Sequence, residues 1–164
     1  MLFRSYYFQK ITPEILRANL RALDANRETL PIDFFQIDDG FEQDVGSWLK
    51  FQPAFPDGIS PLIQEARQKN FTPGIWLAPF ILEHRSELIK EHPDWLLRKP
   101  NGKPVNSGFV WNWLGNALDL TLPAVQDYVR SVIRAAVHEW GVPYLKLDFL
   151  YAAALPGRHA DPTL

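Results

Sequence analysis

The segments FFQIDDG at residues 34–40 and YLKLDFLY at residues 144–151 decide the fold class of this chain. Each contains an apolar run of the kind that forms a β-strand, and each run ends in acidic residues. Burying an unpaired charge is costly, so carboxylates at the end of an apolar strand indicate an open, polar cleft there. In parallel α/β barrels the active site lies at the carboxyl ends of the strands. Both segments therefore predict a catalytic or binding site as well as a sheet.

Length and composition narrow the class of protein. The 164 residues are enough for one domain with a core and too few for two substantial ones, so we predict a single domain over residues 1–164. The net charge is −2 and the basic residues are dispersed, which indicates neither a nucleic-acid partner nor a membrane surface. The chain has no cysteine and begins without the apolar region of a secretory signal, so we expect a cytoplasmic protein.

Strand and helix signals alternate along the chain. The predicted strands are residues 2–8, 32–38, 74–80 and 144–151. The pairs Thr12-Pro13 and Ser60-Pro61 each combine an N-cap residue with a first-turn proline, and they predict helices that start there. A third helix is expected over residues 125–140, with Gly141 as its end. Between residues 81 and 120 the periodicity weakens, so we expect a short helix near 84–91 inside a long functional loop.

The resulting order is β-α-β-α-β-loop-α-β. Each crossover between parallel strands should be right-handed, which gives a parallel sheet covered by helices. Four strands and three crossovers are half of a (β/α)8 TIM barrel, which needs about 250 residues. The alternative is an open α/β sheet of four strands. If it bound a nucleotide, that sheet would need a glycine-rich first turn, and the sequence shows none.

Lys146 and Asp148 are the first pair of candidate site residues. Residues two apart on a strand point to the same side, so the ammonium and the carboxylate should share one face. A nearby cation keeps a carboxylate ionised, as a nucleophile requires. The alternative interpretation is a structural ion pair without a chemical role.

Asp38 and Asp39 are the second pair. Gly40 permits a turn that lets both carboxylates converge on one ligand, and paired acceptors suit a polyol or a metal ion. The alternative is that one of them caps the following loop. Metal binding is the weaker hypothesis because no histidine is close and Asp44 is the only further acid at a suitable spacing, so we predict neither a metal nor a cofactor. Trp76, near a strand end, offers an indole face to a sugar, although core packing alone explains it more simply.

At these motifs the chain resembles the α-galactosidases of glycoside hydrolase family thirty-six. The resemblance runs from about Tyr7 to Arg158 and implies a (β/α)8 catalytic barrel that hydrolyses α-galactosides with retention of configuration. The motifs that carry it are FQIDDGFE (35–42), GSW (46–48), PGIWLAPF (73–80), HPDW (92–95), ALDL (117–120) and YLKLDFLY (144–151).

The resemblance also implies residue roles. Asp148 resembles the catalytic nucleophile and Lys146 a substrate-binding lysine. Asp38 and Asp39 resemble the acids that hold galactose hydroxyls, and Trp76 resembles a wall of that pocket. A retaining glycosidase of this kind forms a covalent glycosyl-enzyme and needs a separate acid/base about 5 Å from the nucleophile.

Two features depart from the family pattern. The family's acid/base lies on a later strand that this sequence does not reach, and Arg4 stands where a pocket tryptophan is expected. We therefore expect the nucleophile-bearing half of a barrel, incomplete for turnover alone. Unpaired strand edges and an exposed apolar interior should make it self-associate or pair with a second half.

Three other functions compete with a melibiose- or raffinose-type α-galactosidase. The first is a transglycosylase that acts on raffinose-type oligosaccharides. The second is a non-catalytic galactose-binding fragment that keeps Asp38, Asp39 and Trp76. The third is a metal-dependent hydrolase built on the two adjacent acids. The sequence does not distinguish linkage or chain-length preference among substrates, or the oligomeric state.

Overall fold

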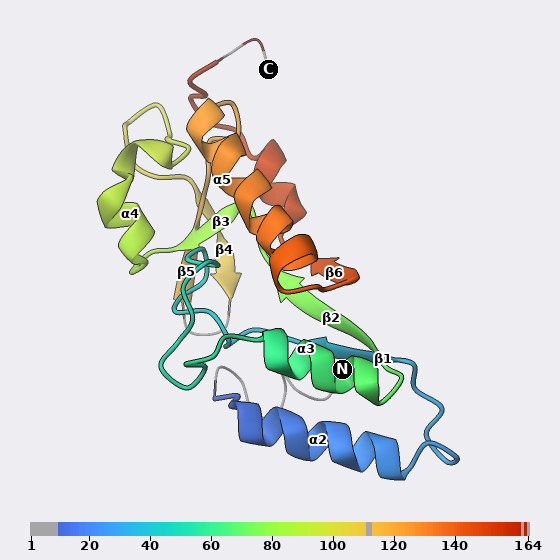
Figure 1. The fold of residues 1–164 in the computed structure, drawn as a ribbon. Helices are drawn as coiled ribbons and strands as arrows, with labels where there is room; N and C mark the ends of the chain where they lie inside the picture. The colour runs from blue at the N-terminus through green and yellow to red at the C-terminus, as the bar shows by residue number, and fades with distance from the viewer. Residues whose placement is uncertain (1–9, 111–112, 162, 164) are drawn as a thin grey trace. The chain divides into compact units, whose positions relative to one another are not determined.

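The computed structural model describes residues 10–110, 113–161 and 163 of the chain (Figure 1). Within these limits the chain forms two compact units. The first takes in residues 10–43, 49–77 and 134–146, and the second takes in residues 44–48, 78–110, 113–133, 147–161 and 163. The single domain predicted over residues 1–164 stays a prediction, and the predicted strand at residues 2–8 lies outside the described residues.

The first unit contains a sheet of three strands in the order β1-β2-β6. These strands are β1 (Phe34–Ile37), β2 (Thr72–Leu77) and β6 (Tyr144–Leu147). β1 and β2 are parallel, with Ile37 opposite Ile75. The sequence predicted all three strands, with longer bounds for β1 and β6 and with bounds shifted toward the C-terminus for β2, and the predicted α/β class with parallel strands is confirmed.

Helix α2 (Pro13–Ala25) starts where the sequence predicted. The Thr12 hydroxyl accepts a hydrogen bond from the Ile15 amide at 3.3 Å, and Leu16 and Leu20 are buried. Helix α3 (Ser60–Gln68) differs from the prediction, because its N-cap is Ile59 and Ser60 is already helical. Proline is tolerated throughout the first helical turn, so a Ser-Pro pair is compatible with either start.

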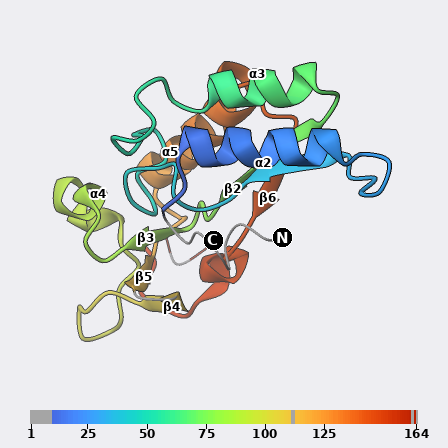
Figure 2. The same cartoon turned by 90° about the horizontal axis from the view of Figure 1, so that it is seen from below.

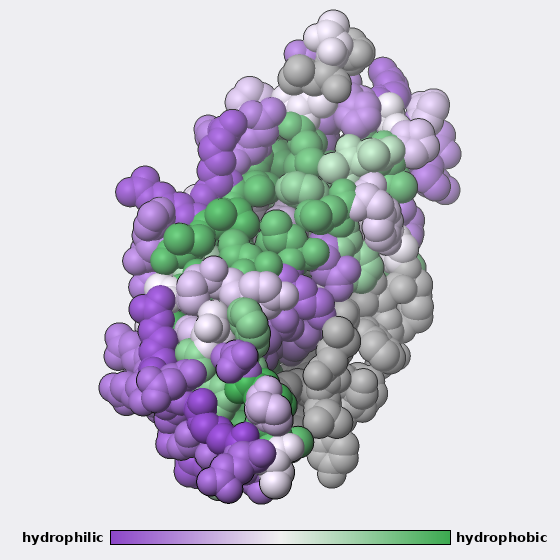
Figure 3. Space-filling model, turned by 90° about the vertical axis from the view of Figure 1, so that its right-hand side faces the viewer, coloured by the Kyte–Doolittle hydropathy of each residue, from purple (hydrophilic) through white to green (hydrophobic). Residues whose placement is uncertain are grey.

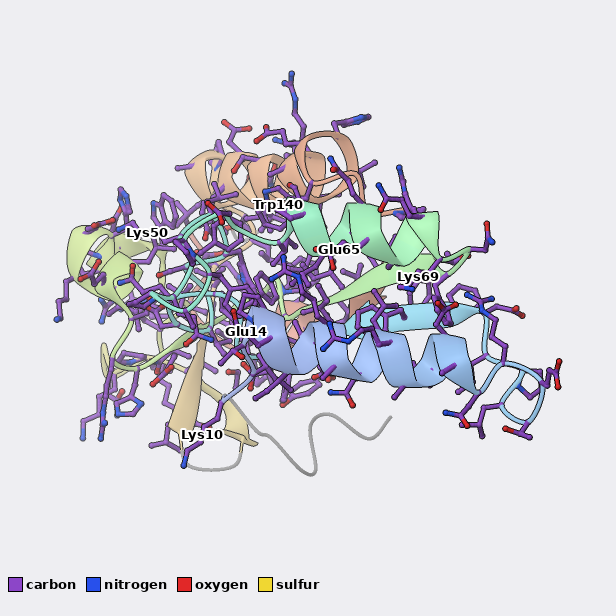
Figure 4. All side chains as sticks on the ribbon, turned by 60° about the horizontal axis from the view of Figure 1, so that its bottom comes forward. Lys10, Glu14, Lys50, Glu65, Lys69 and Trp140 are labelled. Carbon is purple, nitrogen blue, oxygen red and sulfur yellow. The ribbon has the colours of Figure 1, made fainter. Side chains whose placement is uncertain are left out.

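Two ion pairs join α2 to α3, which lie side by side on the sheet of the first unit (Figure 2). Arg17 Nε lies 2.8 Å from Glu65 Oε1, and Lys69 Nζ lies 2.5 Å from Asp24 Oδ2. Figure 4 shows Glu65 and Lys69 on the side of α3 that faces α2. All four side chains are about one-third exposed, so water screens both pairs and they add little to stability.

An aromatic cluster holds the loop that follows β1. Phe41 is fully buried, and its ring centroid lies 6.3 Å from Trp140 and 6.4 Å from Phe51. Trp140 ends the long helix, as predicted: α5 (Pro123–Arg134) continues as a π-helical turn over Ala135–Glu139. Gly141 follows with φ of +71°, a left-handed conformation that glycine adopts at helix ends.

Close packing also explains a glycine in the central strand. A Cβ atom added at Gly74 on β2 would lie 2.4 Å from Tyr144 Cδ1. The Tyr144 ring, on β6, packs edge-on against Phe34 of β1 with centroids 5.3 Å apart. Both rings nevertheless stay exposed, Phe34 by 53% and Tyr144 by 40%, and Figure 3 shows apolar side chains gathered on one face of the surface. The sheet therefore presents apolar surface that the described residues do not cover.

The second unit corrects the predicted long loop between residues 81 and 120. Its strands β3 (Ile81–Glu83), β4 (Asn106–Val110) and β5 (Trp113–Ala117) form an antiparallel sheet in the order β3-β5-β4. The short helix predicted there is confirmed as α4 (Glu87–Glu91), followed by a 3₁₀ turn at Pro93–Trp95. The strands are short and contain glycine and asparagine, which have low β propensity, so cross-strand pairing and burial of Ile81, Leu82 and Ala117 stabilise them instead.

Asp119 anchors the end of the chain within the second unit. Its carboxylate accepts hydrogen bonds from the Thr121 hydroxyl at 2.7 Å and the Ala160 amide at 2.7 Å, and His159 Nδ1 lies 3.2 Å away. Burial alone would raise the pKa of Asp119, but the hydrogen bonds from Thr121, Ala160 and His159 outweigh it and lower that pKa. The residues that follow the 3₁₀ helix Leu150–Ala154 are thereby held to the loop after β5.

Asp119→Asn should lower the free energy of unfolding at pH 7 by about 1–3 kcal/mol, because the amide turns a donor toward the Ala160 N–H. Because the pKa of Asp119 is lower in the folded than in the unfolded state, its carboxylate stabilises the fold above about pH 3.9, the unfolded-state pKa. That stabilisation is lost as the pH falls through the folded-state pKa. Urea unfolding at pH 7 and about pH 3 should therefore show a smaller difference between the two pH values in the variant. Asp127→Asn, at an exposed acid on α5, is the control. Equal effects of the two substitutions would contradict the anchoring role.

Candidate active site

Asp38 and Asp39 directly follow the end of β1, as the sequence predicted. Each is only 5% exposed, so their carboxyl groups sit in a largely desolvated environment. Gly40 comes next with φ of +114°, a conformation that side-chain-bearing residues rarely adopt. The chain therefore turns sharply at the point where both acids leave the strand.

Asp38 is held by three donors. Gln36 Nε2 donates to its Oδ2 atom at 2.9 Å, Lys146 Nζ to the same atom at 3.2 Å, and the Asp39 amide to its Oδ1 atom at 3.0 Å. The Lys146 side chain is 24% exposed and that of Asp38 only 6%, so this ion pair is partly withdrawn from water. The structure thus brings two predicted site residues together, and it adds Gln36, which the sequence reasoning had missed.

A third acid, Glu42, lies beside Asp39. Glu42 is 4% exposed, and its Oε2 atom accepts from the amides of Gly40 at 3.1 Å and Phe41 at 3.0 Å. Burial, together with the neighbouring Asp39 charge, raises the pKa of Glu42 well above its usual range. The sequence reasoning missed Glu42. The signal in the sequence was its place as the last residue of the FQIDDGFE motif, to which no role had been assigned.

Trp76 lies on β2, the central strand of this sheet, and is fully buried. Its burial agrees with the core packing that the sequence favoured for this residue taken alone. Its role as a wall of a sugar pocket, which the family resemblance implies, stays a prediction.

Asp148 follows β6, which ends at Leu147, so the predicted strand at residues 144–151 is too long. Asp148 belongs to the second unit, whereas Asp38, Asp39 and Lys146 belong to the first. Its Oδ1 atom accepts from the Phe149 amide at 2.9 Å. Phe149 has φ of 54°, which is strained for a bulky residue, and strain of this kind concentrates at active sites.

Two features of the described residues bear on the chemistry. Among the described residues, no group of three or more His, Cys, Asp or Glu side chains is arranged to hold a metal ion. None of the described helices combines the length and the apolar character that a membrane span requires. What the first unit does offer is a buried set of acceptors with one ammonium, which suits a ligand rich in hydroxyl donors.

Comparison with known proteins identifies the family. The melibiase family profile matches residues 10–157. "Alpha-galactosidase 2" of Pediococcus pentosaceus is 25% identical over 148 residues, which are 86% of this chain and 20% of that protein. The "Alpha-galactosidase" of Escherichia coli is 28% identical over 141 residues, which are 80% of this chain and 19% of that protein. The chain thus spans about a fifth of the length of these curated relatives.

A solved structure is similar over nearly the whole chain. The α-galactosidase TtGalA from Thermus thermophilus, in complex with stachyose, superimposes with a TM-score of 0.83 and 38% identity over 93% of this chain and 32% of that one. The family profile covers most of the chain and includes Asp38, Asp39, Trp76, Lys146 and Asp148. The chain therefore belongs to the melibiase family, that of the α-galactosidases of glycoside hydrolase family thirty-six.

Proposed function

We propose that this chain carries the nucleophile and part of the galactose pocket of a retaining α-galactosidase that acts on melibiose- or raffinose-type substrates. The observation that carries the proposal is the buried pair Asp38 and Asp39 at the end of β1, with Asp38 held by Lys146. The family supports it, as does the likeness to the Thermus protein, which was solved with stachyose and with p-nitrophenyl α-D-galactopyranoside.

The acids after β1 are suited to hold galactose. Both carboxylates are buried, and Asp39 Oδ1 has no hydrogen-bond partner among the residues that the structure describes. A buried acceptor without a donor is costly, so this pair of acids requires a donor from a neighbouring group or from a ligand, and a sugar hydroxyl is a suitable donor. Lys146, a donor only, restrains Asp38, and its partly exposed ammonium has further N–H groups to donate to a sugar oxygen.

Asp148 is the proposed nucleophile. Its carboxylate attacks the anomeric carbon and forms a covalent galactosyl-enzyme as the bond to the leaving oxygen breaks. The leaving oxygen takes a proton from a separate acid, which later draws a proton from the water that hydrolyses the intermediate. We assign that acid/base to no residue of this chain, because the family resemblance places it on a later strand.

We also propose that the sheet is half of a (β/α)8 barrel in a cytoplasmic protein. Three observations support the barrel: the parallel pairing of β1 with β2, the position of β6 next to β2, and the exposed apolar rings of Phe34 and Tyr144. Such a sheet needs a partner for its apolar surface, either a second copy or the remaining strands.

Incubation with p-nitrophenyl α-D-galactopyranoside should give a galactosyl adduct in the intact mass of the chain. A good leaving group needs little help from a general acid, so the nucleophile is tested alone. Asp148→Asn should remove the adduct while circular dichroism stays unchanged. If the wild-type chain binds galactose and yet forms no adduct, Asp148 is not the nucleophile of this chain.

Asp38→Ala and Asp39→Ala should each weaken galactose binding by about 1.5–3 kcal/mol, or roughly 10- to 100-fold, because each removes a charged hydrogen-bond acceptor. Isothermal titration calorimetry measures the loss, and circular dichroism verifies the fold. Asp33→Ala, at an exposed acid just before β1, is the matched control and should bind as the wild type does. Unchanged affinity in both variants would show that the pocket lies elsewhere.

Light scattering should show that the isolated chain self-associates, because its sheet exposes apolar side chains. Phe34→Ser combined with Tyr144→Ser should shift the distribution toward monomer. A monodisperse wild-type monomer at high micromolar concentration would argue against an unfinished barrel.

A further inference from the structure

We propose that Glu42 is a positioning residue which, in its neutral form, donates a hydrogen bond to Asp39 and so orients the Asp39 carboxylate toward a galactose hydroxyl. The inference rests on the proposed function, in which Asp39 holds the sugar. It assigns a role to a residue outside the set that the sequence and the family resemblance had named.

The hydrogen bonds of Glu42 divide between its two oxygens. Oε2 accepts from the amides of Gly40 and Phe41, so it closes the turn on which Asp39 stands. The remaining oxygen is left for the contact with the Asp39 side chain. Two ionised carboxylates are both acceptors and cannot hydrogen-bond to each other, so this contact requires a proton between them.

Burial decides which form the pair adopts. Glu42 is 4% exposed and Asp39 5%, and two negative charges at that depth would repel each other strongly. The Lys146 ammonium contacts Asp38 Oδ2, so the positive charge of the lysine compensates Asp38 and not the pair formed by Asp39 and Glu42. Burial and the Asp39 charge raise the pKa of Glu42, which agrees with Glu42 as the member that keeps the proton.

The backbone holds Glu42 in place. Glu42 forms an isolated antiparallel bridge with Phe51, and the flanking hydrogen bonds run from the Gln43 amide to the Lys50 carbonyl at 2.8 Å and from the Gln52 amide to the Phe41 carbonyl at 3.1 Å. A proton donor on such a fixed support restricts the rotation of the Asp39 side chain.

The arrangement leaves one oxygen of Asp39 for a ligand. Asp39 Oδ1 is buried and has no hydrogen-bond partner among residues 10–110 and 113–161. The Glu42 proton satisfies this buried oxygen, and Oδ2 is then the acceptor that a sugar hydroxyl would reach. Glu42 therefore acts through Asp39 and not on the substrate itself.

Glutamine and alanine at position 42 separate this role from a purely structural one. In Glu42→Gln the amide oxygen accepts from Gly40 and Phe41 while the NH₂ group donates to Asp39, so galactose affinity should stay within about twofold of the wild type. Glu42→Ala should lose about 10-fold or more in affinity among the folded molecules, because Asp39 is no longer oriented. Gln43→Ala, at the exposed neighbouring residue, is the control and should change neither affinity nor folding.

Either of two results overturns the proposal. If Glu42→Gln loses as much affinity as Glu42→Ala, an ionised carboxylate is needed at this position. If folded Glu42→Ala binds galactose as the wild type does, Glu42 only supports the turn. Titration calorimetry gives the affinity, and circular dichroism gives the folded fraction.

A measurement without sugar keeps this test separate from that of the proposed function. In ¹³C-carboxyl NMR of the wild-type chain, the Glu42 signal, assigned by its absence from Glu42→Gln, should titrate well above the ordinary glutamate range of about pH 4.3. Titration of Glu42 in the ordinary range would overturn the inference even if galactose binds. A raised titration without galactose binding would refute the pocket and leave the Asp39–Glu42 proton in place.

Discussion

The ion pair between Lys146 and Asp38 is the constraint on which the arrangement of the first unit depends. Neighbouring strands lie about 4.8 Å apart, and β2 separates β1 from β6, so the two residues start about 10 Å apart. The lysine side chain, the Asp38 side chain and the 3.2 Å contact between them together bridge that distance, which a shorter side chain at position 146 would not. The pair therefore compensates a carboxylate buried at the end of β1 and fixes the end of β6 relative to it.

The turn after β1 has its own support. Phe41, Phe51 and Trp140 form the apolar side of that support, and Glu42 provides the polar side by accepting the amides of Gly40 and Phe41. Asp39 stands between these two sides, on the turn that both of them hold. A site that binds a neutral, hydroxyl-rich ligand benefits from this arrangement, because its acceptors are oriented before the ligand arrives.

The second unit shows a different use of an aspartate. Asp119 accepts from Thr121 and Ala160, and the chain after Asp148 is held by these contacts. Asp148 itself precedes Phe149 in a left-handed conformation, and such strain persists only where the surrounding structure enforces it. Asp119 thus joins two distant parts of the chain and serves structure, while Asp148, whose own contact with Phe149 is local, is the candidate for chemistry.

The sequence by itself determined the local features: the helix start at Thr12-Pro13, the end of the long helix at Gly141, and the acids at the strand ends. These depend on neighbouring residues, through caps, glycine conformation and hydrophobic periodicity. Only the tertiary structure decided that Lys146 pairs with Asp38, 108 residues away, that Glu42 is buried beside Asp39, and that the supposed loop at residues 81–120 is a small sheet. The physical reason is that ion pairing, burial and strand pairing depend on residues that are distant in sequence and close only after folding.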